Sequence, residues 1–113
     1  MALPSRGEVW EVDLDPTHKR EQAGKRPALV VSVNQLNHGP AGLAIVLPMT
    51  TRPKGIRFHV EIAPPEGGLR RPSFVKPEDI RSVSVERLGR RFGEVSGQTL
   101  ATVDTRLRAL LDL

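Results

Sequence analysis

The chain has 113 residues, no cysteine and a formal net charge of +4, from 17 Lys and Arg against 13 Asp and Glu. This length predicts a single domain, 1–113, with its own core, and the lack of cysteine excludes disulfides and thiolate metal sites. Apolar runs fall short of the roughly 20 residues of a membrane helix, so we expect a cytoplasmic protein with no membrane contact. The positive charge favours a polyanionic partner such as RNA or DNA.

The first half of the chain predicts three strands. Residues 8–14 alternate polar and apolar side chains, which is typical of a half-buried strand. Residues 28–33 and 43–49 are almost entirely apolar and of strand length, which indicates two central strands. The segments between and after them are polar or rich in turn residues: 17–25, 37–42 and 50–55.

The second half predicts shorter strands, with a connector between the first two. Residues 57–62 alternate cleanly, and 63–68 read as a flexible connector with Gly67–Gly68 as its hinge. Pro77 suits the start of a single helical turn. The remaining strand candidates are 73–75, 81–85 and 91–95.

The C-terminus changes from a strand period to a helical one. Ser96 is a suitable N-cap. The apolar residues that follow form one helical stripe: Leu100, Val103, Leu107, Leu110 and Leu111. Short strands followed by one helix predict a mainly β protein, either a small and strongly bent β-barrel or a double sheet. Apolar strands near a sheet edge also favour pairing with a second copy of the chain.

Two polar residues stand where the central strands begin and end. Pro27 fixes its own φ and holds Arg26 extended at the entry to the strand 28–33. Thr50 follows directly after the strand 43–49. If these strands are antiparallel neighbours, both residues lie at the same end of the sheet. A guanidinium beside a hydroxyl is a good receptor for the phosphate of a phosphodiester.

Plainer interpretations of the same residues stay open. An Arg-Pro before a strand is usually only a turn, and Thr-Thr at a strand end is usually a β-former or a cap. For other chemistry the sequence offers little: His18, His38 and His59 share no metal-ligand spacing. There is also no nucleophile turn and no glycine-rich phosphate loop. We therefore expect neither a metal nor a cofactor.

Four segments of the chain resemble the MazF/PemK toxins, the endoribonuclease half of bacterial toxin–antitoxin pairs. They lie in the order of that family, at 6–13, 21–28, 47–55 and 79–83. The resemblance implies an SH3-like barrel with a C-terminal helix, the toxin fold that MazF shares with CcdB and Kid. It also implies a homodimer that cleaves single-stranded RNA at short sequences without a metal, and a MazE-like antitoxin that blocks the RNA groove.

The resemblance also implies roles for individual residues. The catalytic arginine falls on Arg26 and the catalytic threonine on Thr50, while Glu21 is a possible catalytic or positioning residue. A guanidinium keeps its proton at neutral pH and is a poor base, so charge stabilisation is the expected task of Arg26. Residues expected to contact RNA are Gln22, Lys25, Thr51, Arg52 and Lys54.

Two rival functions share the predicted fold. One is a toxin that acts on DNA gyrase through aromatic C-terminal residues, but residues 109–113 read Ala-Leu-Leu-Asp-Leu and contain no aromatic. The other is an RNA-binding barrel without catalysis. The two polar loops that carry Arg26 and Thr50 argue against it only weakly.

Overall fold

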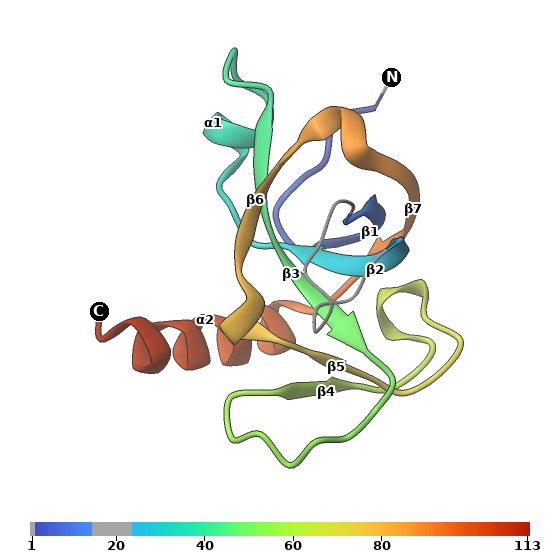
Figure 1. Cartoon of the computed structure of the whole chain (residues 1–113), viewed down its shortest axis with the longest axis vertical. Helices are drawn as coiled ribbons and strands as arrows, with labels where there is room; N and C mark the ends of the chain where they lie inside the picture. Colours follow the sequence, from blue (N-terminus) through green and yellow to red (C-terminus); the bar gives the residue numbers. More distant parts are fainter. Residues whose placement is uncertain (1, 15–23) are drawn as a thin grey trace.

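The computed structural model describes residues 2–14 and 24–113, and shows a strongly curved sheet followed by a C-terminal helix (Figure 1). The helices are α1 (Asn34–Asn37) and α2 (Gly97–Leu111), with single 3-10 turns η1 (Glu66–Gly68), η2 (Pro77–Asp79) and η3 (Val85–Arg87). The strands are β1 (Glu8–Asp13), β2 (Lys25–Val30), β3 (Leu43–Thr50), β4 (Val60–Ile62), β5 (Ser73–Val75), β6 (Arg81–Ser84) and β7 (Leu88–Glu94). The predicted mainly β fold with a C-terminal helix is confirmed.

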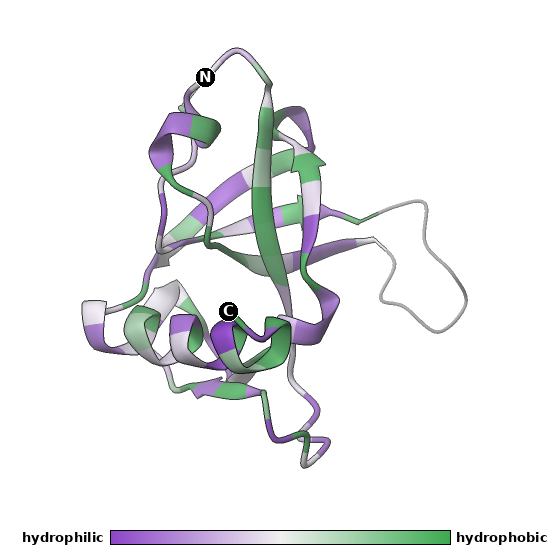
Figure 2. Ribbon diagram, turned by 90° about the vertical axis from the view of Figure 1, so that its left-hand side faces the viewer, coloured by the Kyte–Doolittle hydropathy of each residue, from purple (hydrophilic) through white to green (hydrophobic). Residues whose placement is uncertain are grey.

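Strand β3 is the centre of the sheet. The strand order is β4-β5-β3-β2-β1-β7, and β6 pairs with β3 off this path. One edge of β3 pairs with β2, while the other pairs first with β6 and then with β5, always antiparallel. Figure 2 shows β3 as a nearly continuous hydrophobic ribbon, as expected for a strand covered on both faces.

The two faces of this sheet carry separate apolar clusters. Alternate side chains of a strand point to opposite faces, so Leu47 and Met49 join one cluster and Val46 joins the other. The first cluster includes Val103 of α2, which is fully buried, and we call its side of the sheet the helix face. The second, which contains Trp10, lies on what we call the barrel face.

Helix α2 is held at its N-terminus by two side chains. Ser96 Oγ accepts a hydrogen bond from Thr99 N at 3.1 Å, which confirms the predicted N-cap. The carboxylate of Glu66 accepts from Ser96 N at 2.9 Å. Hydrogen bonds from Thr99 and then Ser96 lower the pKa of Glu66. At the other end Leu111 is 46% exposed, so its assignment to the apolar stripe was wrong.

Among the described residues, no helix has the length and apolarity to cross a membrane.

Three predicted strands differ in their limits from the observed ones. The run 28–33 corresponds to β2, which begins at Lys25 and ends at Val30; Val33 instead leads into α1, a helix that the sequence did not indicate. The strand expected at 57–62 is shortened to β4, and the one at 91–95 is extended to β7. The remaining predicted strands are confirmed to within a residue.

The predicted hinge at Gly67–Gly68 was wrong, because this segment is closely packed. The two glycines belong to η1, which lies against β7. A Cβ built on Gly68 would lie 1.9 Å from the carbonyl oxygen of Phe92, and the residue has a φ of +68°. Only glycine allows both this backbone conformation and this close approach.

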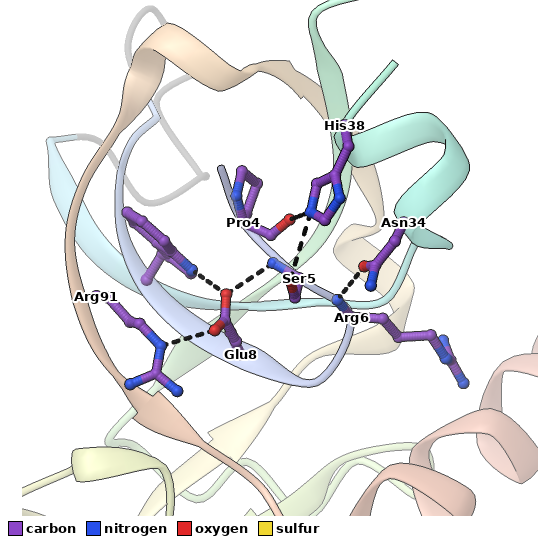
Figure 3. A network of polar contacts seen from close by, with 8 residues as sticks. Pro4, Ser5, Arg6, Glu8, Asn34, His38 and Arg91 are labelled. Carbon is purple, nitrogen blue, oxygen red and sulfur yellow. Dashed lines mark hydrogen bonds and ion pairs between the residues drawn. The ribbon is translucent and has the colours of Figure 1, made fainter. Parts of the chain in front are cut away.

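A polar network fixes the chain where it enters β1 (Figure 3). The carboxylate of Glu8 accepts hydrogen bonds from Ser5 N at 2.7 Å, Trp10 Nε1 at 3.0 Å and Arg91 Nε at 2.7 Å. Partial burial by itself would raise the pKa of Glu8. The hydrogen bonds from Arg91, Trp10 and Ser5 outweigh it and lower that pKa below its usual value.

Candidate functional site

The two predicted catalytic residues lie on neighbouring antiparallel strands. Arg26 belongs to β2 and Thr50 is the last residue of β3. Three residue pairs define the register of these strands, the nearest to the site being Ala28 with Pro48. Continued by two residues along both strands, this register puts Arg26 across from Thr50, on the barrel face of the sheet. The strand pairing therefore puts both residues at the same end of the sheet and on the same face.

Arg26 offers an exposed guanidinium on an ordered strand. It pairs across the sheet with Val12 of β1, a fully buried residue, so its backbone is fixed. None of the four ion pairs found within 2–14 and 24–113 involves Arg26. An exposed guanidinium on a paired strand is suited to bind an external oxyanion.

Thr50 differs from Arg26 in being only 6% exposed. Its Oγ1 accepts a hydrogen bond from Arg52 N at 3.1 Å, and its backbone pairs with Phe74 of β5. A hydroxyl that accepts from the backbone retains its own hydrogen for donation. The backbone contact thus orients the hydroxyl and leaves it able to donate to a phosphate oxygen.

The other predicted contact residues divide into two groups. Lys25, in β2 across from Asp13, is exposed beside Arg26. Thr51, Arg52 and Lys54 are exposed in the segment that leads from β3 to β4. Both groups flank the same end of the β2–β3 pair. The remaining two residues, Glu21 and Gln22, lie outside the described residues.

A polar cluster next to this site escaped the sequence analysis. Lys76 is only 5% exposed, its Nζ lies 2.8 Å from Asp79 Oδ2, and its backbone N donates to Pro48 O at 2.9 Å. Nearby on the same turn η2, Glu78 Oε2 lies 2.6 Å from Nε2 of His59. The i, i+3 spacing of Lys76 and Asp79 was the only signal in the sequence. It did not reveal that the lysine is buried, or that its backbone is bonded to Pro48, two residues before Thr50 in β3.

Metal ligation gains no support from the described part of the chain. There, no three or more His, Asp or Glu side chains gather in an arrangement that would hold a metal ion.

The chain matches one protein family over nearly its whole length. Residues 5–111 match the model of the PemK-like, MazF-like toxin of type II toxin–antitoxin systems. Endoribonuclease MazF9 of Mycobacterium tuberculosis is 39% identical over 113 residues, which cover 96% of each chain. Endoribonuclease EndoA of Bacillus subtilis is 32% identical over 113 residues, 98% of this chain and 97% of the relative.

Solved structures agree with the family match. A crystal structure of MazF from Deinococcus radiodurans superposes with a TM-score of 0.87 at 30% identity, covering 100% of both chains. A MazE–MazF complex from the same organism gives a TM-score of 0.81 at 27% identity and covers 100% of this chain and 99% of the other. A family model that spans most of the sequence and a shared fold lead to one conclusion: the chain belongs to the PemK-like, MazF-like toxin family of type II toxin–antitoxin systems.

Proposed function

We propose that this toxin is a sequence-specific, metal-independent endoribonuclease that cleaves single-stranded RNA to 2′,3′-cyclic phosphate and 5′-OH ends. The register of β2 and β3 supports the proposal: continued by two residues beyond the pair Ala28–Pro48, it puts Arg26 across from Thr50 at one end of the sheet. Relatives named as endoribonucleases, at 30–39% identity over almost the entire chain, support it.

The proposed reaction is an attack of the ribose 2′-OH on its own 3′-phosphate. The bond from phosphorus to the 2′-oxygen forms and the bond to the 5′-oxygen breaks, while the 2′-OH loses a proton and the leaving oxygen gains one. Because nucleophile and phosphate belong to the same nucleotide, correct positioning supplies much of the rate. Arg26 stabilises the added negative charge with two parallel hydrogen bonds, and Thr50 donates a third.

The proton acceptor is the least defined part of this mechanism. Arginine keeps its proton at neutral pH, so we assign Arg26 to charge stabilisation. Glu21, nearby in the sequence, is the proposed base. A second role for the same carboxylate is to hold Arg26 by an ion pair. Glu21→Gln distinguishes the two, because the amide oxygen can still accept a hydrogen bond from Arg26 but cannot take a proton from the 2′-OH.

Exposed polar side chains around the site are proposed to bind the rest of the RNA. Lys25, Arg52 and Lys54 suit phosphate contacts, and Gln22 and Thr51 suit hydrogen bonds to base edges. DNA is expected to be a poor substrate, because it lacks the attacking hydroxyl.

The partner proposals rest on the family. Four of the similar structures are complexes: one of an endoribonuclease with its cognate antitoxin, and three of MazE with MazF. We therefore propose a MazE-like antitoxin that binds this chain and blocks cleavage. We also propose that the toxin acts as a homodimer in the cytoplasm.

Cleavage of a long transcript in EDTA tests the activity directly. Discrete cuts that end in cyclic phosphates support the proposal, whereas an intact transcript supports a gyrase-directed toxin or a non-catalytic RNA-binding protein. A matched RNA with 2′-deoxyribose at one mapped cleavage site tests the chemistry. Cleavage there should stop, and equal cutting of both RNAs would exclude cyclisation.

A further inference from the structure

Two side chains without a role so far continue the row of Arg26 and Thr50 across the sheet. Thr50 of β3 pairs with Phe74 of β5, and Phe74 in turn pairs with Glu61 of β4. These three strands lie side by side in Figure 1. Directly paired residues of neighbouring strands present their side chains on the same face. The row therefore runs from a hydroxyl to an aromatic ring to a carboxylate.

The neighbouring row of the same three strands fixes the face to which these side chains belong. Met49, Val75 and Val60 are also paired directly across β3, β5 and β4, and all three are buried in the helix-face cluster. Each residue of the first row is next in sequence to one of them, so its side chain points to the opposite face. The ring and the carboxylate thus share the barrel face with the candidate cleavage site.

Phe74 has a ring that the core does not enclose. The residue is only partly buried and belongs to neither apolar cluster. Trp10, by contrast, is buried in the barrel-face cluster, and the ring of Phe92 is covered by the guanidinium of Arg90, 4.7 Å from its centroid. A partly open aromatic ring beside a phosphate-binding residue is suited to stack on a nucleobase, whichever base it is.

Glu61 adds a hydrogen-bond acceptor at the far end of the row. The residue is exposed, and no ion pair joins it to another residue of 2–14 or 24–113. An ionised carboxylate only accepts hydrogen bonds, and it binds best to two donors that lie side by side. Guanine offers two such donors on its Watson–Crick edge, N1–H and the N2 amino group. Adenine, cytosine and uracil each offer one donor beside an acceptor, so the carboxylate favours guanine.

The spacing of the row fits one nucleotide. Neighbouring strands are roughly 4.8 Å apart, so the backbones of Thr50 and Glu61 are roughly 10 Å apart, with Phe74 halfway between them. This separation is comparable to the distance from a phosphate to the Watson–Crick edge of its purine. A phosphate held at Thr50 therefore leaves the attached base over Phe74, with its edge at Glu61.

We propose that Phe74 and Glu61 form a guanine subsite, which binds one of the two bases that flank the scissile phosphate. Phe74 stacks on the base, and the carboxylate of Glu61 accepts hydrogen bonds from N1–H and from the N2 amino group. The inference rests on the ribonuclease function proposed above and adds which base this end of the sheet selects.

Binding of RNA that cannot be cleaved tests the subsite apart from catalysis. The probes are labelled uridine pentanucleotides with a central guanine, inosine or adenine, in which fluorine replaces every 2′-OH, and fluorescence anisotropy gives each Kd. The guanine probe should bind about tenfold more tightly than the adenine probe. Inosine, which lacks the N2 amino group, should fall between them. Glu61→Gln should reverse the preference, since an amide can donate to N1 of adenine and accept from its N6 amino group.

Two further variants separate base reading from charge and from packing. Glu86→Gln removes another exposed carboxylate, in η3, which follows β6 at the opposite end of β3, and it should keep the preference for guanine. Phe74→Leu keeps an apolar side chain but removes the aromatic ring. It should weaken the binding of all three probes about tenfold and leave their order unchanged. The melting temperature of each variant checks its folding.

The cleavage pattern of a long transcript provides the second test. Guanine should dominate at one position next to the bond that the intact toxin cuts, and Glu61→Gln should change that position alone. The subsite is overturned if the intact toxin binds the guanine and adenine probes equally, if Glu61→Gln and Glu86→Gln behave alike, or if guanine is favoured on neither side of the cuts. A transcript left uncut by every protein would refute the nuclease instead, and the anisotropy measurements would still decide the subsite.

Discussion

The arginines at the two ends of β1 have different surroundings. Where the chain enters β1, Arg91 is neutralised by the carboxylate of Glu8, and Arg6 is paired in the same way with Asp104. Where β1 ends, beside β2, Arg26 is exposed, and it has no ion pair within the described residues. The first kind of arginine ties elements of the fold together, and the second retains its donors for a ligand. Replacing a paired group should therefore reduce stability, and replacing Arg26 should reduce activity.

The largest effect is expected from Arg26→Ala. Removing the group that stabilises the charge on the phosphate should lower kcat/KM for RNA about 10²–10³-fold. The melting temperature should hardly change, because Arg26 is exposed and makes no ion pair with a described residue. Arg108→Ala, also at an exposed arginine, is the control and should cleave normally. A comparable loss in both variants would mean that overall charge matters and not this position.

Thr50→Val should have the next largest effect. Valine keeps the shape of the buried side chain but removes the hydroxyl, so cleavage should fall roughly 10–100-fold, the value of one hydrogen bond to a charged group. Thr50→Ser restores the hydroxyl and should recover most of the rate. If serine and valine are equally inactive, the methyl group or its packing is what matters, and the hydroxyl has no role as a donor.

Glu8→Ala tests the paired end of the comparison. It removes the acceptor of three hydrogen bonds and should lower the free energy of unfolding by about 1–3 kcal/mol, measured by chemical denaturation. RNA cleavage by the folded fraction should be unchanged.

The same carboxylate predicts a direction for the pH dependence of stability. The pKa of Glu8 is lowered in the folded protein. Its stabilising contribution is therefore complete above the ordinary pKa of glutamate and is lost as the pH falls through the folded value. The stability difference between the intact protein and Glu8→Ala should shrink on acidification. A difference that stays constant down to strongly acidic pH would contradict this assignment.

The smallest effect is expected from Lys54→Ala, in the segment between β3 and β4. Lys54 is exposed and is proposed to contact a phosphate. Its loss should weaken RNA binding only a few-fold and lower the slope of log affinity against log salt by about 0.7, the value for one contact to a single strand. An unchanged slope would remove Lys54 from the RNA-binding surface.

Local patterns in the sequence predicted most strands but misplaced the start of β2. The chain before Ala28 was expected to be a loop, since proline lacks the N–H of a central strand. In the structure, the pairing of β2 with β3 begins only at Ala28, while Pro27 pairs with Glu11 of β1. Proline is tolerated at this position because β3 does not pair with it, so the missing N–H interrupts no hydrogen bond between β2 and β3. Helix α1 was missed because Val33 continues the apolar run.

The candidate site was predictable to the extent that it depends on neighbouring strands. Arg26 and Thr50 flank two apolar runs, and antiparallel pairing of those runs was enough to bring them to one end of the sheet. The buried pair Lys76–Asp79 was not predictable. It depends on the long-range pairing of β3 with β5 and on where η2 lies against them. A lysine in a polar stretch looks exposed until that pairing is known.

A double-mutant cycle on Arg26 and Thr50 tests the central claim most directly. Values of kcat/KM would be measured for the intact toxin, Arg26→Ala, Thr50→Val and the double variant, on one RNA with a mapped cleavage site. Side chains that hold the same phosphate are coupled, so the double variant should lose much less than the product of the two single losses. A loss equal to that product would show that the guanidinium and the hydroxyl act independently, and the shared phosphate site would have to be abandoned.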